Sequence, residues 1–351
     1  LETCANAAAL THKVARPDLL LFGALLHDIG KGRPGDHTEV GMALMEEIGP
    51  RLGYDADDTA VLIDLIRHHL LLPDVAVRRD LSDDATIAAV ADAVGDRGRL
   101  ELLAALTEAD SLATGPAAWG SWKAELVREL VRRVDHYLAG GDLAALTTVE
   151  FPDERQLALL QAGETVVTAE EDALELVAPD RPGLFVRVAG VLALHGLDVL
   201  SADATARDGM ALERFRVTSR FGSMIAWDRV EADLLAALDH RLALEARLAE
   251  RIATYSRGGP RPGLPPASIR FDDAASRTAT VIELTAPDRI GLLYRVLRSF
   301  AELDLDVRVA KVQTLGDLMI DAFYVTRRDG SLVADPDVRA ELERSLLHAV
   351  S

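Results

Sequence analysis

The sequence contains one cysteine, few aromatic residues and fewer basic than acidic residues. Cys4 stands alone, which excludes an intrachain disulfide framework and fits a reducing cytoplasm. The 38 basic residues are outnumbered by 57 acidic ones, so the net charge is −19. Because nucleic acids and membrane surfaces are anionic, this charge disfavours a general DNA, RNA or membrane binder. No apolar run reaches the roughly 18 residues that a membrane span requires. These absences favour a cytoplasmic protein.

An initiator methionine and a signal peptide are also missing. The first residues, "LETCANAAAL", are typical of the inside of a helix. We therefore expect the chain to be part of a longer protein. Its 351 residues are enough for two or three domains, and with 49% apolar residues each domain can bury a core.

The hydrophobic pattern divides the chain into two parts. Up to about residue 140, stretches such as "DDTAVLIDLIRHHLLL" repeat apolar residues every three or four positions, which predicts a helical bundle. After "LAGGD", segments such as "ALERFRVTS" and "MIDAFYVTRR" alternate every second residue, as strands do. Helical segments are expected between the strands at 182–195, 227–253, 291–303 and 335–348. The pattern predicts an all-α domain followed by α+β structure.

A long internal repeat lies in the second part. "LELVAPDRPGLFVRVAG" matches "IELTAPDRIGLLYRVLR", and equivalent residues such as Glu175 and Glu283 are 108 positions apart. Each copy reads strand, turn, helix, strand, strand, helix, which predicts a small antiparallel sheet with helices on one face. Between the copies, "YSRGGPRPGLPPAS" is too rich in proline and glycine for regular structure.

Histidines and aspartates gather at predicted helix ends in the first part. "LLHDIGKGRPGDH" and "IRHH" supply most of them, and the candidates are His27, Asp28, His37, His68, His69 and Asp110. Imidazole and carboxylate hold divalent metals, which neutralise a phosphodiester and activate water for its hydrolysis. Each residue by itself also fits a helix cap, a solvated position or a packed side chain, so the residues alone leave both roles open. His12 and His136 lack such neighbours, and we expect surface or packing roles for them.

The whole set resembles the HD hydrolase superfamily, which is named for an adjacent His-Asp pair. The resemblance implies that His27, Asp28 and Asp110 bind the metal. It further implies that His37 and His68 have catalytic roles in which they bind phosphate or a second metal, and that Lys31 is a catalytic charge beside the phosphate. Adjacent helical residues point about 100° apart, so only one of the "HH" pair is expected to face the site. We expect His68 rather than His69, and a further histidine ligand just before Leu1.

Each repeat turns from strand to helix through "APDRPGL" or "APDRIGL". The glycines permit close backbone approach, the helix start suits a carboxylate, and the aspartates suit an ammonium group. Together these features fit an amino acid, although helix capping by the aspartates explains them equally well. The repeats resemble ACT domains, βαββαβ modules that bind amino acids between paired copies. The resemblance implies contacts from Asp180, Arg181, Gly183, Leu184, Asp288, Arg289, Gly291 and Leu292.

An HD domain joined to tandem ACT domains, with "TEADSLATGPAAWGSWKAELVREL", is similar to the bifunctional uridylyltransferase/uridylyl-removing enzymes of bacterial nitrogen control. This resemblance implies a multidomain protein without its transferase domain. The expected parts are an HD domain at 1–145, a connector at 146–171, ACT domains at 172–254 and 279–351, and a Pro/Gly linker at 255–278.

The same resemblance implies a function. A Mg²⁺- or Mn²⁺-dependent phosphodiesterase would remove a uridylyl or adenylyl group from the PII signal protein, under control of glutamine bound to the ACT domains. It also allows a homo-oligomer formed through those domains. Two alternatives remain open at this point. One is a relative of the alarmone hydrolases, and the other is a non-catalytic amino-acid-sensing regulator with an incomplete HD site.

Overall fold

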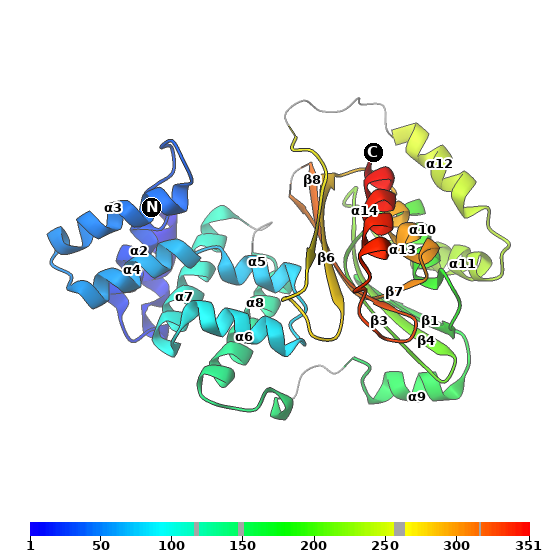
Figure 1. The fold of residues 1–351 in the computed structure, drawn as a ribbon, viewed down its shortest axis with the longest axis horizontal. Helices are drawn as coiled ribbons and strands as arrows, with labels where there is room; N and C mark the ends of the chain where they lie inside the picture. The colour runs from blue at the N-terminus through cyan, green and yellow to red at the C-terminus, as the bar shows by residue number, and fades with distance from the viewer. Residues whose placement is uncertain (116–118, 147–150, 256–263, 316) are drawn as a thin grey trace. The chain divides into compact units, whose positions relative to one another are not determined.

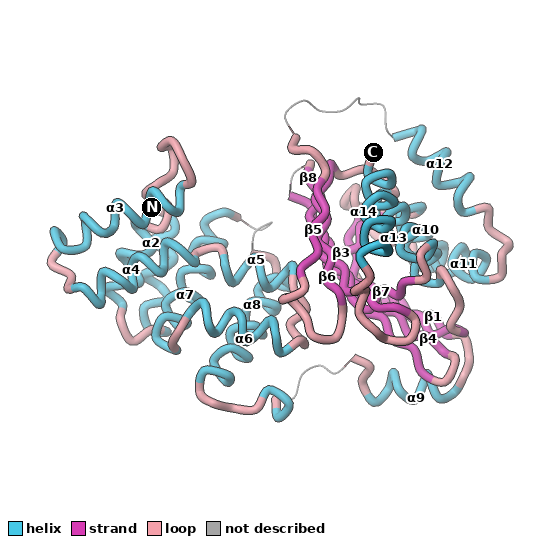
Figure 2. The backbone as a smooth tube through the Cα atoms, viewed as in Figure 1, coloured by secondary structure: helices cyan, strands magenta, loops and turns pink. Residues whose placement is uncertain are grey.

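The computed structural model describes residues 1–115, 119–146, 151–255, 264–315 and 317–351. The chain divides into two compact units, Leu1–Thr148 and Val149–Ser351. The first consists of helices, and the second combines one sheet with helices, as Figure 1 and Figure 2 show. The prediction of an all-α part followed by α+β structure is confirmed. In the described part of the chain, no helix combines the length and the apolar character needed to cross a membrane.

The helical unit contains eight α-helices within its described residues. They are α1 (Glu2–Leu10), α2 (Pro17–Leu26), α3 (His37–Leu52), α4 (Ala56–His68), α5 (Leu71–Arg78), α6 (Asp84–Val94), α7 (Arg97–Thr114) and α8 (Ser121–Leu138). Short 3₁₀ turns lie at Thr11–Lys13 and Leu143–Ala145. Four helices begin at an aspartate whose carboxylate accepts backbone N–H groups, namely Asp36, Asp55, Asp83 and Asp96. Such caps satisfy donors that the first helical turn leaves free.

Helix α7 forms the centre of this unit. It contacts α1, α2, α4, α5, α6 and α8. Its apolar residues Leu103, Leu106 and Ala109 are fully or almost fully buried. Asp110 follows Ala109 on this helix, and α7 contacts α2 and α4, the helices that lead to other metal candidates.

The described residues of the second unit form one antiparallel sheet of eight strands. The strands are β1 (Val166–Glu170), β2 (Ala173–Pro179), β3 (Leu197–Arg207), β4 (Met210–Ser219), β5 (Ser268–Asp272), β6 (Thr280–Pro287), β7 (Leu305–Leu315) and β8 (Leu318–Arg327). Their order is β1-β2-β4-β3-β7-β8-β6-β5. This order is symmetric about the β3–β7 pair, where Ala202 lies opposite Ala310. Those two alanines are equivalent in the sequence repeat, so the two copies meet at an approximate two-fold axis.

Helices cover the sheet unequally. They are α9 (Glu154–Ala162), α10 (Leu184–Leu194), α11 (Trp227–Leu238), α12 (Leu244–Tyr255), α13 (Leu292–Glu302) and α14 (Pro336–Val350). Figure 1 shows α10, α11, α13 and α14 on one side of the sheet, and the main core lies beneath them. On the other face, Leu160 of α9 packs with Val177 and Leu212.

The strand order within each half differs from the expected βαββαβ. The outer strand precedes the repeat instead of following its second helix, because β1 pairs with β2 and β5 pairs with β6. The expected connector at 146–171 therefore contains β1, and the expected linker at 255–278 contains β5. Both strands have only five residues and are half-buried or exposed. Such short strands give too weak an alternation to be recognised from sequence. The predicted helix at 227–253 is also divided, into α11 and α12.

Candidate metal centre

His27 ends helix α2 and is buried, with 5% of its surface exposed. Its Nδ1 lies 3.0 Å from the Ala24 carbonyl oxygen. A carbonyl only accepts hydrogen bonds, so Nδ1 carries the proton of the neutral ring and Nε2 keeps its lone pair. That Nε2 lies 3.2 Å from an oxygen of Asp28 and 3.2 Å from one of Asp110. Metal-bound histidines commonly have this arrangement, with the second nitrogen donating to a backbone carbonyl.

His69 follows helix α4 and repeats the same arrangement. Its Nδ1 lies 2.7 Å from the Ile66 carbonyl oxygen, and its Nε2 lies 3.7 Å from Asp28 Oδ1. The His27 and His69 ring centroids are 5.5 Å apart. Two helix ends therefore direct two imidazole lone pairs at one carboxylate.

His37 is the first residue of α3, and its position depends on Gly30. A Cβ atom at Gly30 would lie 1.9 Å from the His37 carbonyl oxygen, so only glycine lets the His-Asp turn approach this helix start. Asp36 caps the helix by accepting the N–H groups of Thr38 and Glu39. The structure brings one ligand atom each of Asp28, His37 and His69 within 4.8 Å of one another.

Asp110 closes the cluster from α7. The Thr3 hydroxyl on α1 donates to its carboxylate at 3.2 Å. Contact with the His27 ring holds the pKa of Asp110 below its ordinary value. Burial lowers the pKa of His27, but the Asp110 and Asp28 carboxylates outweigh burial, so the pKa of His27 is raised. Burial lowers the pKa of His69, which favours its neutral form.

The cluster fits a cation. Asp28 Oδ1 and His37 Nε2 are buried, and neither has a hydrogen-bond partner among the described residues. Buried polar atoms are normally paired, so two unpartnered ligand atoms facing the same space indicate a missing positive group. Nitrogen and oxygen donors in this combination suit a divalent metal ion.

The structure places Lys31 beside the cluster and His68 away from it. Lys31 Nζ lies 2.6 Å from Asp28 Oδ2, and its side chain is 62% exposed. His68 lines a small separate cavity of about 10 Å³ with Asp64 and Arg99. The structure thus brings His69, instead of the expected His68, to the other candidates, and the role expected for His68 stays a prediction.

The signal for His69 was present in the sequence. Leu62, Leu65 and Ile66 are buried on α4, and His69 continues their spacing of three, four and seven residues. His68 lies one residue off that face. Thr3 was also missed, because a lone threonine near the start of a helix has no distinctive pattern.

The two histidines expected to have no part in the site lie away from the cluster. His12 is exposed. The His136 ring lies 3.0 Å from the Asp142 carbonyl oxygen, in a hydrogen bond at the end of α8.

These histidines and aspartates form a candidate metal site in the all-α unit, and residues 1–95 match the HD domain family. The chain is also similar to longer proteins named bifunctional uridylyltransferase/uridylyl-removing enzyme. Identity is 42% for the one from Streptomyces coelicolor, over 94% of this chain and 46% of the relative. It is 39% for Mycobacterium tuberculosis, over 100% of this chain and 45% of the relative. The relative from Azospirillum brasilense is 33% identical, over 98% of this chain and 43% of the relative.

The chain thus spans about half the length of the curated relatives it matches. The resemblance expected from the motifs is confirmed, and the chain is a homologue of the bifunctional uridylyltransferase/uridylyl-removing enzymes.

Proposed function

We propose that the helical unit hydrolyses the phosphodiester that links a nucleotidyl group to a protein. The Nδ1 atoms of His27 and His69 each contact a backbone carbonyl oxygen, so both rings direct the Nε2 lone pair toward Asp28. This geometry is the observation that carries the proposal. The names of the relatives favour a uridylyl group, with adenylyl as the alternative. We take the PII signal protein as the substrate, and the single cysteine fits a cytoplasmic location.

Five side chains would hold the metal, for which we propose Mg²⁺ or Mn²⁺. They are His27, Asp28, His37, His69 and Asp110. When bound, such an ion supplies Lewis acidity and a water of lowered pKa. Thr3 orients the Asp110 carboxylate through its hydroxyl. Lys31 is exposed beside Asp28, where its ammonium can neutralise a phosphate oxygen of the substrate.

The experiment is a measurement of uridine monophosphate released from uridylylated PII. Release with Mn²⁺, and its loss on chelation, supports the proposal. Release that is unchanged by complete chelation contradicts the metal role. Tight Mn²⁺ binding without release favours the non-catalytic regulator.

We propose further that the two halves of the sheet are ACT domains that bind glutamine. The repeat gives each half the same turn from strand to helix, with Gly183 at φ 76° and Gly291 at φ 74° preceding α10 and α13. This left-handed backbone suits glycine, and it leads Leu184 and Leu292 into the core. The remaining predicted contacts are Asp180, Arg181, Asp288 and Arg289. Among them, Arg289 donates to the Ser351 carbonyl oxygen at 2.6 Å.

A further inference from the structure

The approximate two-fold axis of the sheet relates two pockets to each other. In the first, the turn Asp288–Gly291 faces Asp198 and Arg220. In the second, the turn Asp180–Gly183 faces Asp306 and Arg328. Each of these residues is 108 positions from its equivalent. The sequence repeat therefore gives both pockets the same turn with the same facing aspartate and arginine, so the arrangement of those side chains can be compared directly.

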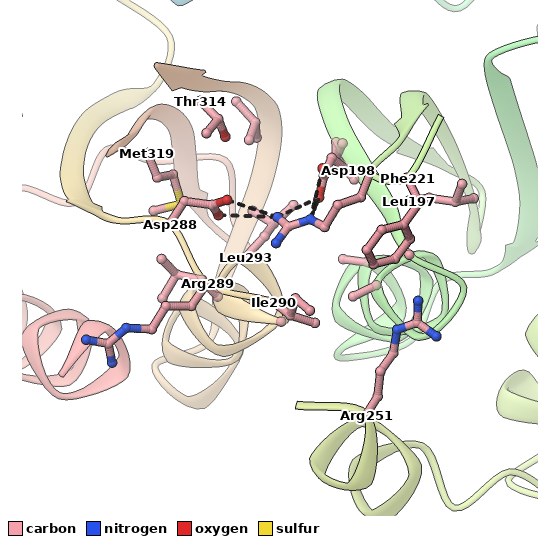
Figure 3. Close-up of a pocket in the computed structure, with 18 residues that line it drawn as sticks. Leu197, Asp198, Phe221, Arg251, Asp288, Arg289, Ile290, Leu293, Thr314 and Met319 are labelled. Atoms are coloured by element: carbon pink, nitrogen blue, oxygen red, sulfur yellow. Dashed lines mark hydrogen bonds and ion pairs between the residues drawn. The ribbon is translucent and has the colours of Figure 1, made fainter. Parts of the chain in front are cut away.

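The first pocket is closed by an internal ion pair, and we call it the bridged pocket. Arg220 Nη2 lies 2.8 Å from Asp198 and 3.1 Å from Asp288 (Figure 3). Its guanidinium thus joins the two halves of the sheet across the pocket. The remaining cavity is about 50 Å³, enough for only a few water molecules.

The second pocket has no such bridge, and we call it the open pocket. Arg328, the equivalent of Arg220, pairs with Asp304 at 3.3 Å instead of bridging two aspartates of the pocket. The cavity is about 290 Å³, near the lower end of the range for small-molecule sites. Ala211 lines it where Met319 lines the bridged pocket, so the wall is also less bulky.

Three carboxyl groups line the open pocket, and no arginine of the described residues bridges them as Arg220 does in the bridged pocket. Within the described residues, no hydrogen bond or ion pair reaches the side chain of Asp180, Glu213 or Asp306. Glu213 is only 3% exposed, and its Oε2 is buried and unpartnered. Burial raises the pKa of Asp306, and the charge of Asp180 adds to this effect. Asp180 and Asp306 therefore offer two carboxylates that a cationic ligand group can pair with, since buried charges are normally paired.

We propose that the open pocket is the amino-acid site, and that Arg220 occupies the bridged pocket as an internal substitute for the ammonium group of the ligand. The inference rests on the proposed amino-acid binding by this unit. The ammonium lies between Asp180 and Asp306, where the equivalent carboxylates of the bridged pocket hold a guanidinium. Arg181 and Arg308 also line the open pocket and offer positive charge to the ligand carboxylate.

Calorimetric titration of the chain with glutamine tests this assignment. We expect one glutamine per chain. Asp306→Asn lowers the affinity roughly tenfold to hundredfold, as expected for the loss of a charge-assisted contact. Asp198→Asn, at the equivalent position of the bridged pocket, is the matched control and keeps the affinity of the unaltered chain. Asp180→Asn gives the same loss as Asp306→Asn, which guards against a folding defect in one variant.

Arg220→Met tests whether Arg220 closes the bridged pocket. Its removal frees Asp198 and Asp288, so we expect a second glutamine to bind per chain. Stoichiometry that stays at one overturns the role of Arg220. Loss of binding in Asp198→Asn, with binding kept in Asp306→Asn, overturns the choice of pocket but keeps the proposed amino-acid binding. Absence of heat with the unaltered chain for every amino acid overturns the proposed binding itself.

Discussion

His69 and Asp28 face each other across 3.7 Å, from the ends of two different helices. This separation of Nε2 and Oδ1 is too long for a hydrogen bond. It is close to the roughly 3 to 3.5 Å that separates two ligands of one ion when each bond is about 2.0 to 2.2 Å. The hydrogen bond between the His69 ring and the Ile66 carbonyl oxygen holds the ring in this orientation. The separation therefore suits a shared ion in the proposed metal site.

The adjacent histidines provide a direct test of the site. His69→Gln should lower the affinity for Mn²⁺ by at least roughly tenfold, because loss of a ligand costs no less than loss of an outer-shell partner. His68→Gln should leave the affinity unchanged, since His68 lies with Asp64 and Arg99. Calorimetric titration with Mn²⁺ alone measures both. A larger effect from His68→Gln than from His69→Gln would refute the arrangement described above.

Gly30 should be intolerant of any side chain. In Gly30→Ala, the new Cβ collides with the His37 carbonyl oxygen, so the turn and the start of α3 must separate. We expect a loss of about 1 to 3 kcal/mol in the free energy of unfolding, together with weaker Mn²⁺ binding. Urea denaturation measures the first quantity. Gly98→Ala is the control, because only Asp96 Oδ1, at 3.3 Å, lies near its added methyl group. Equal stability of the two variants would contradict the close approach.

Thr3 should act on metal affinity through Asp110. Thr3→Val removes the hydroxyl that donates to the Asp110 carboxylate, so we expect Mn²⁺ affinity to fall roughly tenfold. Thr107→Val is matched to it, because Thr107 lies on α7 and its buried hydroxyl has no hydrogen-bond partner among the described residues. Titration with Mn²⁺ should separate the two variants. Equal affinities would show that Thr3 has no orienting role.

Glu213 should make the stability of the chain depend on pH. Burial raises its pKa well above the ordinary value of 4.5, and the charge of Asp180 adds to this effect. Below pH 4.5 both the folded and unfolded chains keep the proton. Above it the unfolded chain loses the proton first, so folding loses stability as pH rises toward the raised pKa.

Glu213→Gln removes this titration. Its melting temperature should exceed that of the unaltered chain at about pH 8, and the difference should shrink toward about pH 4. Glu231→Gln, at an exposed position of α11, is the control. Its melting temperature should differ from that of the unaltered chain by a small amount that is the same at both pH values. A difference for Glu213→Gln that does not vary with pH would rule out the buried, protonated side chain.

The strongly periodic segments and the long repeat were predictable from sequence. The helical part and the antiparallel sheet region follow from apolar spacing, and the 108-residue repeat predicted two similar halves. The joining of both halves into one sheet was not predicted. Pairing such as Ala202 with Ala310 depends on edges that a local pattern does not specify. The strands β1 and β5 were missed for a different reason, because five residues give too weak an alternation to be recognised.

The site shows a similar limit. His27, Asp28, His37 and Asp110 were named from sequence, and the structure brings them together with His69. The choice between His68 and His69 depended on where α4 stops and which face continues past its end. That face was visible in Leu62, Leu65 and Ile66, which are spaced as one buried stripe. The different arrangements of Arg220 and Arg328 were not predicted, because the aspartate that pairs with Arg328, Asp304, has a glycine, Gly196, as its equivalent in the repeat, and this single difference was not weighed.

The most direct test compares the unaltered chain with Asp28→Asn, measuring bound Mn²⁺ and the release of uridine monophosphate from uridylylated PII in the same samples. Asp28 lies between His27, His69 and Lys31, so its loss should weaken metal binding and abolish release together. We predict that the unaltered chain releases uridine monophosphate only with Mn²⁺, and that Asp28→Asn releases none. Undiminished release by Asp28→Asn would contradict a hydrolytic site built on this aspartate.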